Sequence, residues 1–293
     1  MLTKEYIYTT SLPFCPPQTQ ILKKIEFDTT FVERVSHFRA DGLEMHTSED
    51  ALSQNCVSVE RPSLTLARVV VGMPVGHEHR KDALRLRRYI SRVSAVLRIL
   101  GKGLRHLHER GAVHGGICPK NCGKFGEVWK ITGLTGAEII GGEFTRLRLG
   151  VYSPPESVSA RRVGSKYRGH DDVKMMDYSL RKSLGASPAI DMWAFGKLMY
   201  EVFVGKELIP SDPEKEMCRD SKALTALGAW DTKNLKEVVG QLSLTGIGSL
   251  GADLVSHCLC PSPDDRPRSM EEILKHPFWK ETRKRGKTSS RDK

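Results

Sequence analysis

The stretch Leu107 to Asn121, LHERGAVHGGICPKN, decides how the rest of the chain is interpreted. Before it, apolar residues recur at alternating spacings of four and three, at positions 86, 90, 93, 97, 100, 104 and 107. This spacing places them on one face of a long helix, with Asp82 as a candidate N-cap and Gly111 as its stop. Gly101 and Gly103 interrupt the repeat, which favours a buried helix over a coiled coil.

The quoted stretch resembles the catalytic loop of eukaryotic protein kinases, whose pattern is H-R-D-L-K-P-x-N. Three residues match it and a fourth is a near match: His114, Pro119 and Asn121, with Ile117. Three others depart from it, because Gly115, Gly116 and Cys118 stand where the pattern has Arg, Asp and Lys. The resemblance therefore keeps the frame of the loop and loses its acid–base chemistry.

Further kinase-like motifs follow in the expected order. Val128 to Thr135, VWKITGLT, lies where the family has K-x-x-D-F-G, so Gly133 replaces the magnesium-binding Asp. Tyr152 to Glu156, YSPPE, resembles the A-P-E end of the activation segment, 24 residues from Gly133 to Glu156 inclusive. Asp191 to Gly196, DMWAFG, resembles the D-x-W-S-x-G opening of the central helix of the large lobe.

The last part of the chain carries the remaining matches. Arg266, in PDDRP, resembles the arginine that pairs with the A-P-E glutamate. Ser269 and Glu272 predict a capping box for a final helix that ends at HPFW. The resemblance covers Leu86 to Trp279 and implies an α+β fold with two lobes.

The domain boundaries follow from these motifs. Residues 1–60 are expected to form a divergent, β-rich small lobe, and residues 61–279 a mainly helical large lobe. Glu156 and Asp191 are 35 positions apart, about twenty more than the family needs, so residues 157–187 are interpreted as a basic, exposed insertion. Residues 280–293 carry seven basic and two acidic residues and are interpreted as a disordered tail.

The small lobe is the least regular part of the resemblance. The glycine-rich hairpin is missing, since the first glycine is Gly42. Lys23, in QILKKI, lies where the family has the phosphate-pairing lysine, and Glu33 is its expected partner on a helix indicated by Phe31, Val35 and Phe38. Residues 55–62, NCVSVERP, resemble the last strand and the hinge. The resemblance implies that any nucleotide would meet Lys23, Glu33 and Asn121.

Two carboxylates carry phosphoryl transfer in this family, one as the base and one as a magnesium ligand. Gly116 and Gly133 occupy both positions. Between residues 111 and 137 the only acidic residue is Glu127, beside three lysines, Lys120, Lys124 and Lys130. A divalent cation needs oxygen ligands, so we expect no metal site and no catalytic residue here. ATP and magnesium would be cofactors only if activity is retained.

Four retained residues have structural roles in the family. His114 packs beneath the cleft, Asp191 holds the backbone of the catalytic loop, and Glu156 pairs with Arg266 to tie the activation segment to the large lobe. The sequence thus favours a pseudokinase that acts as a protein-interaction or regulatory scaffold. An atypical Ser/Thr kinase that borrows ligands from Glu138 and Glu143 is the alternative.

Composition and charge bear on the remaining classes of function and on the location of the protein. The net charge is +11 over 293 residues, much of it in the insertion and the tail, and this leaves a polyanion-binding role as a weaker hypothesis. Nucleic acid is not the expected partner; a protein is. The sequence contains no apolar run long enough to span a membrane and no signal-peptide pattern, and its seven cysteines have no regular spacing. We therefore expect a cytoplasmic or nuclear protein.

Two short patterns are weak indications of a binding site. Residues 246–251, GIGSLG, match G-x-G-x-x-G only formally, because no strand is expected before them. The sequence His257-Cys258-Leu259-Cys260 is a weak metal signal, because the sequence offers no second ligand pair at a suitable distance.

Overall fold

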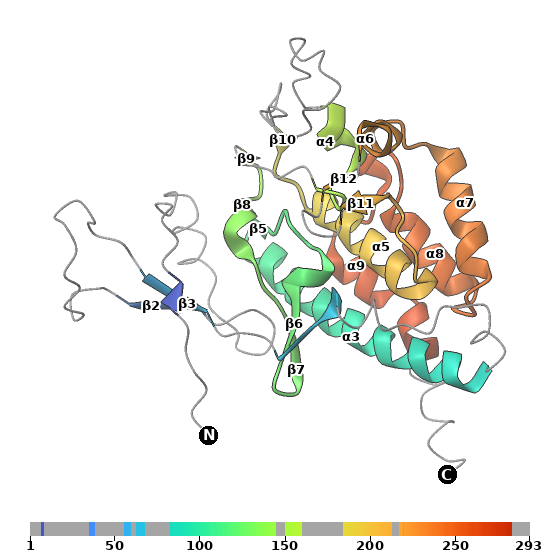
Figure 1. Ribbon diagram of the computed structural model, residues 1–293, viewed down its shortest axis with the longest axis horizontal. Coiled ribbons are helices and arrows are strands. Elements are labelled where there is room, and N and C mark those ends of the chain that lie inside the picture. Colours follow the sequence, from blue (N-terminus) through green and yellow to red (C-terminus); the bar gives the residue numbers. More distant parts are fainter. Residues whose placement is uncertain are drawn as a thin grey trace.

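The computed structural model describes residues 7–8, 35–38, 56–59, 63–67, 83–144, 150–159, 184–212, 217–218 and 220–282. Figure 1 shows a large helical part in which α5 runs through the middle, with α3 on one side and α7 and α8 on the other. Short strands lie along the side of this part that carries the catalytic-loop motif.

The N-terminal region contributes a small antiparallel sheet. It consists of β1 (Ile7–Tyr8), β2 (Val35–Phe38) and β3 (Cys56–Val59), in the order β1-β3-β2. The helix predicted from Phe31, Val35 and Phe38 is wrong over 35–38, where the chain pairs with β3. Three apolar positions are too few to define a helical period, and β-branched and aromatic residues also favour strands, so sheet pairing decides. The predicted phosphate-pairing Lys23 and Glu33 lie outside the described residues.

The long helix α3 (Ala83–Glu109) is formed as predicted. Its buried face consists of Ile90, Val93, Leu97, Leu100, Leu104 and Leu107. Gly111 ends the helix with a positive φ of 75°, and its N–H bonds the carbonyl of His108 at 2.9 Å. Gly101 allows α9 (Met270–Lys275) to approach closely, since a Cβ there would lie 3.1 Å from Leu274. The predicted N-cap, Asp82, lies outside the described residues.

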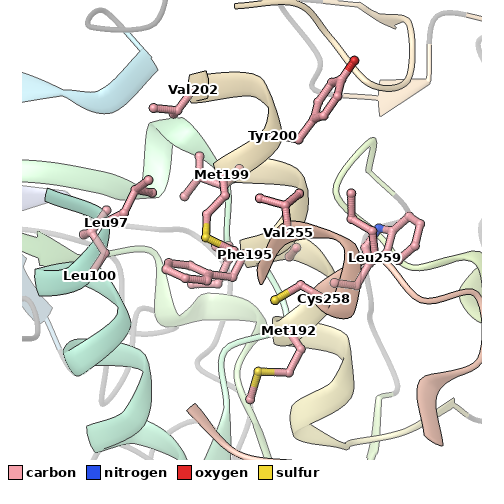
Figure 2. Close-up of a cluster of buried hydrophobic side chains, with 14 of the residues drawn as sticks. Leu97, Leu100, Met192, Phe195, Met199, Tyr200, Val202, Val255, Cys258 and Leu259 are labelled. Atoms are coloured by element: carbon pink, nitrogen blue, oxygen red, sulfur yellow. The ribbon is translucent and has the colours of Figure 1, made fainter. Parts of the chain in front are cut away.

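Helix α5 (Pro188–Val204) is the centre of the core. Ser187 caps it by accepting a hydrogen bond from the N–H of Ala189 at 3.3 Å, and Gly205 ends it at φ 71°. Every residue from Ile190 to Val204 is buried, and Figure 2 shows its side chains packed between α3 and the C-terminal part of α8 (Ser249–Cys258). A Cβ at Gly196 would lie 2.5 Å from Cys258 Cβ, so this close contact requires glycine.

The other helices complete the large lobe. They are α4 (Pro155–Ser159), α6 (Ser221–Gly228) and α7 (Thr232–Ser243), with 3₁₀ turns η3 (Pro119–Asn121), η4 (Leu134–Gly136) and η6 (Pro263–Asp265). The capping box predicted for α9 is only half formed. Ser269 accepts from the N–H of Glu272, but the Glu272 carboxylate accepts from Arg268 N–H instead of Ser269 N–H. Among the described residues, no helix is long and apolar enough to cross a membrane.

The remaining described strands form small antiparallel sheets, and β5 and β6 flank the catalytic-loop motif. A three-stranded antiparallel sheet has the order β4-β6-β7, formed by β4 (Leu64–Thr65), β6 (Cys122–Phe125) and β7 (Val128–Ile131). Pairs are formed by β5 (Ala112–Val113) with β8 (Glu138–Ile139), by β9 (Glu143–Phe144) with β10 (Leu184–Gly185), and by β11 (Ser211–Asp212) with β12 (Met217–Cys218). The loop between β5 and β6 is therefore held at both ends by sheet pairing.

The two ends of the predicted insertion belong to regular structure. Residues 157–159 lie in α4, and Leu184 and Gly185 form β10, which pairs with β9. Residues 160–183 and the tail beyond residue 282 lie outside the described residues.

Candidate functional site

The loop that follows β5 is fixed by the carboxylate of Asp191 at the start of α5. Asp191 Oδ2 accepts from the N–H of His114 at 2.7 Å, and Oδ1 accepts from the N–H of Gly115 at 2.9 Å. His108, near the end of α3, contacts Oδ2 through Nε2 at 2.8 Å. One buried carboxylate therefore joins α3, α5 and the loop, as the resemblance implied for Asp191 and the loop backbone.

His114 is fully buried beneath the loop, with both ring nitrogens engaged. Its Nδ1 accepts from the N–H of Gly116 at 3.1 Å, so Nε2 carries the proton and donates to the carbonyl of Thr132 at 2.9 Å. Burial lowers the pKa of His114, although the nearby Asp191 charge and the Thr132 bond act in the opposite direction. His114 is therefore neutral at pH 7 and holds the loop against the end of β7.

Asp191 stays ionised in this surrounding. Burial alone would raise the pKa of its carboxyl group, but the hydrogen bond and charge of His108, together with His114, lower the pKa below its usual value. The carboxylate is used entirely as an acceptor for the loop.

Neither of the two glycines at the catalytic positions supplies a charge, but their surroundings differ. At Gly116, an added Cβ would make ordinary contacts of 3.7–3.8 Å with His114 and Asn121. At Gly133, φ is 78° and an added Cβ would lie 2.6 Å from Cγ and Oδ1 of Asn121. The amide of Asn121 thus fills the space beside Gly133 into which a side chain would project.

Asn121 itself is turned into the loop. Its Nδ2 donates to the carbonyl of Gly116 at 2.8 Å. An amide held in this way bridges the two glycine positions and stabilises the loop backbone. The residue that the resemblance assigned to nucleotide binding thus donates a hydrogen bond to the loop backbone, and its role in nucleotide binding stays a prediction.

Gly115 also has a conformation that suits glycine. Its φ is 68°, and an added Cβ would lie 2.8 Å from the ring of Phe144 and 2.9 Å from the carbonyl of Gly136. Replacement of the family's arginine by glycine therefore lets β9 and η4 pack directly against the loop.

We expect Gly133→Ala to lower the free energy of unfolding by about 1–3 kcal/mol, because it adds backbone strain and displaces the Asn121 amide. Gly116→Ala should stay within about 1 kcal/mol of the parent, since its Cβ fits. The measurement is urea unfolding at pH 7.

The matched control is Gly126→Ala in the β6–β7 turn. Gly126 has a φ of 56° but no atom within 4 Å of an added Cβ, so it reports backbone strain alone. An effect of Gly133→Ala no larger than that of Gly126→Ala would contradict a steric role for Asn121.

The other described acidic residues near the loop are Glu127, Glu138 and Glu143. Glu127 pairs with Lys124 at 3.0 Å at the tip of the β6–β7 hairpin, with its side chain 94% exposed. Glu138 accepts from the N–H of Ile139 at 2.9 Å, and Glu143 is exposed on β9. Among the described residues, none of them belongs to a group of three or more His, Cys, Asp or Glu side chains close enough to hold one metal ion. Magnesium prefers oxygen ligands, and the described loop offers no carboxylate at positions 116 and 133.

Glu156 and Arg266 form the ion pair implied by the resemblance. Both terminal nitrogens of Arg266 donate to Glu156, one to each carboxylate oxygen, at 2.8 Å. Arg266 also donates to three backbone carbonyls, those of Cys260, Ala189 and Pro261. The guanidinium lies 5.1 Å from the ring centre of Trp193. The pair joins α4 to α5 and to the turn before α9.

A second buried charged group was not predicted from the sequence. Lys197 and Glu201 face each other on α5, and the Lys197 ammonium lies 3.7 Å from the centre of the Tyr152 ring. The hydroxyl of Tyr152 in turn donates to Glu201. The available signal was a Lys and a Glu four positions apart within an otherwise apolar helix. The cluster connects α5 to the YSPPE motif.

Comparison with known proteins places the chain in a family. The protein kinase domain family model matches residues 76–279, more than half of the chain. Among solved structures, the chain is similar to the kinase PK-1 of the Cydia pomonella granulovirus, with a TM-score of 0.56 and 14% identity. That match covers 93% of this chain and 84% of the viral one. A search of curated proteins found no match.

The chain therefore belongs to the protein kinase family, and its fold is the α+β, two-lobed fold of that family. The predicted resemblance to protein kinases and the predicted fold class are confirmed.

Proposed function

We propose that this protein is a pseudokinase, a kinase-like domain that binds and regulates another protein without transferring phosphate. The observation that carries this proposal is that glycines occupy both carboxylate positions, with the Asn121 amide beside Gly133. Gly116 and Gly133 provide no carboxylate, and the Asn121 amide lies 2.6 Å from the point where a Gly133 side chain would begin.

The rate acceleration that the two carboxylates would supply is large, and its expected absence supports this proposal. A positioned general base contributes roughly 10²–10⁴-fold to a rate, and most of the remaining acceleration of phosphoryl transfer comes from positioning and electrostatic stabilisation around the metal. Both contributions depend on groups that are absent at these positions. In contrast, the contacts of Asp191, His114 and Arg266 are all in place, which suits a domain kept for its shape.

We expect thermal unfolding of the protein to be unchanged by ATP or ADP, with or without magnesium. A ligand at 100 times its Kd would add about 2.7 kcal/mol to the free energy of unfolding, a shift of several degrees for a domain of this size. The measurement requires only a cooperative unfolding transition of the purified chain.

The other outcomes are distinct. A magnesium-dependent shift would overturn the proposal, because it would mean that a metal site is rebuilt in the cleft. A shift without magnesium would keep the pseudokinase and make nucleotide a structural ligand. Asn121→Ala is the control for either shift, because Asn121 lies beside both glycines. If nucleotide binds in the cleft, the shift in unfolding temperature should differ between this variant and the parent.

The alternative is an atypical active kinase that uses Glu138 and Glu143. Its discriminating variant is Glu138→Gln with Glu143→Gln, tested for ATP hydrolysis and for phosphate transfer to protein. A magnesium-dependent activity that disappears in this variant would support the alternative. The internal hydrogen bond of Glu138 and the exposure of Glu143 weigh against it.

A further inference from the structure

A group of metal-ligating side chains lies outside the kinase cleft, where α8 meets the segment that follows α9. It consists of Asp253 and His257 on α8 and His276 at the C-cap of α9. Asp253 and His257 are four residues apart, which places them on one face of the helix. None of these residues contacts the catalytic loop in the interactions described above.

The distances within the group suit a single ion. Asp253 Oδ2 lies 3.0 Å from His276 Nε2 and 3.8 Å from His257 Nδ1. One ligand atom from each residue lies within 4.8 Å of the other two. Zinc bonds of about 2.0–2.2 Å in tetrahedral geometry separate ligand atoms by about 3.3–3.6 Å. The observed separations bracket that range, so small side-chain rotations would bring all three atoms onto one ion.

The backbone of the group is held rigidly. His276 is followed by Pro277 and then by Phe278 and Trp279, whose side chains are buried in the core. The indole N–H of Trp279 donates to the carbonyl of Ile273 at 2.7 Å. The His276 side chain is 15% exposed, while Asp253 and His257 are 50% and 55% exposed. The group is thus anchored on one side and open to an incoming ion on the other.

The ligand chemistry selects the ion. Two imidazoles and one carboxylate form a mixed nitrogen and oxygen set, which suits Zn²⁺ and other borderline transition metals, whereas Mg²⁺ and Ca²⁺ take oxygen ligands. We propose that Asp253, His257 and His276 bind Zn²⁺ with a fourth position left for water. The ion would connect α8 to the C-terminal end of the large lobe.

One contact opposes binding and limits its strength. Nδ1 of His276 accepts a long hydrogen bond, 3.3 Å, from the N–H of Phe278. An ion on Nε2 of neutral His276 moves the ring proton to Nδ1, where it faces the Phe278 N–H, so that bond is lost. Metal binding also displaces the direct contact between Asp253 and His276. We therefore expect weaker binding than at a closed four-ligand structural site.

The experiment is calorimetric titration of Zn²⁺ into the full chain at pH 7.5, with Co²⁺ absorption as a second readout. We expect one ion per chain at this site. His257→Gln leaves the Asp253–His276 contact intact but removes a ligand. It should weaken Zn²⁺ binding by more than about 10-fold, because changing even a residue that only hydrogen-bonds a metal ligand typically costs at least that much affinity. Asp253→Asn should do the same.

Two controls separate this site from others. Glu237→Gln removes a carboxylate on α7 that is not in the group, and Cys260→Ser removes the nearby thiol that donates to Ser256; both should bind Zn²⁺ as the parent does. Equal affinity of the parent and His257→Gln would overturn the proposal. Loss of binding in Cys260→Ser, or a sulfur-to-cobalt charge-transfer band, would also overturn it by placing the ion on cysteine.

Discussion

Arg266→Ala should lower the free energy of unfolding by about 3–5 kcal/mol, the range found when one partner of a buried ion pair is removed. The side chain of Arg266 is fully buried and donates to both oxygens of Glu156 and to three backbone carbonyls. The variant leaves these acceptors without their donor and opens a cavity beside Trp193. Urea unfolding at pH 7 measures the change.

A surface ion pair provides the control for Arg266. Lys275 pairs with Glu271 four residues earlier on α9, with its side chain 75% exposed. Lys275→Ala should therefore cost less than about 0.5 kcal/mol. The paired replacement Arg266→Met with Glu156→Gln should cost less than Arg266→Ala, because it leaves no uncompensated charge. If Arg266→Ala were as mild as Lys275→Ala, the ion pair would not hold the activation segment in place.

Asp191→Asn should also be strongly destabilising, by roughly 2–4 kcal/mol, because two N–H donors and His108 share the carboxylate and an amide offers only one acceptor oxygen. The effect should depend on pH. Because the folded-state pKa of Asp191 is lowered, its charge adds stability above the unfolded pKa of about 4, and this stability is lost as the pH falls below that value.

The difference between the parent and Asp191→Asn should therefore shrink below about pH 4. His114 affects the free energy of unfolding at higher pH than Asp191 does. Its folded pKa is also lowered, so the unfolded chain binds a proton first, and stability falls as the pH drops below about 6.5. Urea unfolding of the parent and the variant across this range checks both points. A difference that stays constant down to pH 3 would contradict the assignment.

The helical core could be predicted from the sequence because its helices are marked by patterns that extend over many residues. Seven apolar positions predicted α3, and the resemblance of the DMWAFG motif predicted α5. The helix expected near Val35 was wrong because its pattern had only three members, and long-range pairing with β3 overrode it. The capping box predicted at Ser269 is half formed, because Glu272 bonds the neighbouring N–H of Arg268 instead of that of Ser269.

The candidate site was only partly predictable. The sequence identified Gly116 and Gly133 as the positions of the missing carboxylates, and the partners of Asp191 and Arg266 followed from the resemblance. The orientation of the Asn121 amide depends on a side-chain rotamer and on the φ of Gly133, which no sequence pattern encodes. The proposed zinc ligands come from α8 and from the C-cap of α9, and Asp253 and His276 are 23 positions apart. The short motif at His257 therefore could not identify the full set of ligands.

The contact between Gly133 and Asn121 has a consequence for how this chain can evolve. Restoring aspartate at position 133 by a single substitution would place its Cβ 2.6 Å from the Asn121 amide and in a left-handed backbone conformation. The first step back would therefore cost stability before any activity returned. The Asn121 side chain would have to shift to make room, and position 116 would need its own aspartate. A carboxylate at position 133 therefore requires a shift of the Asn121 side chain in addition to the substitution itself.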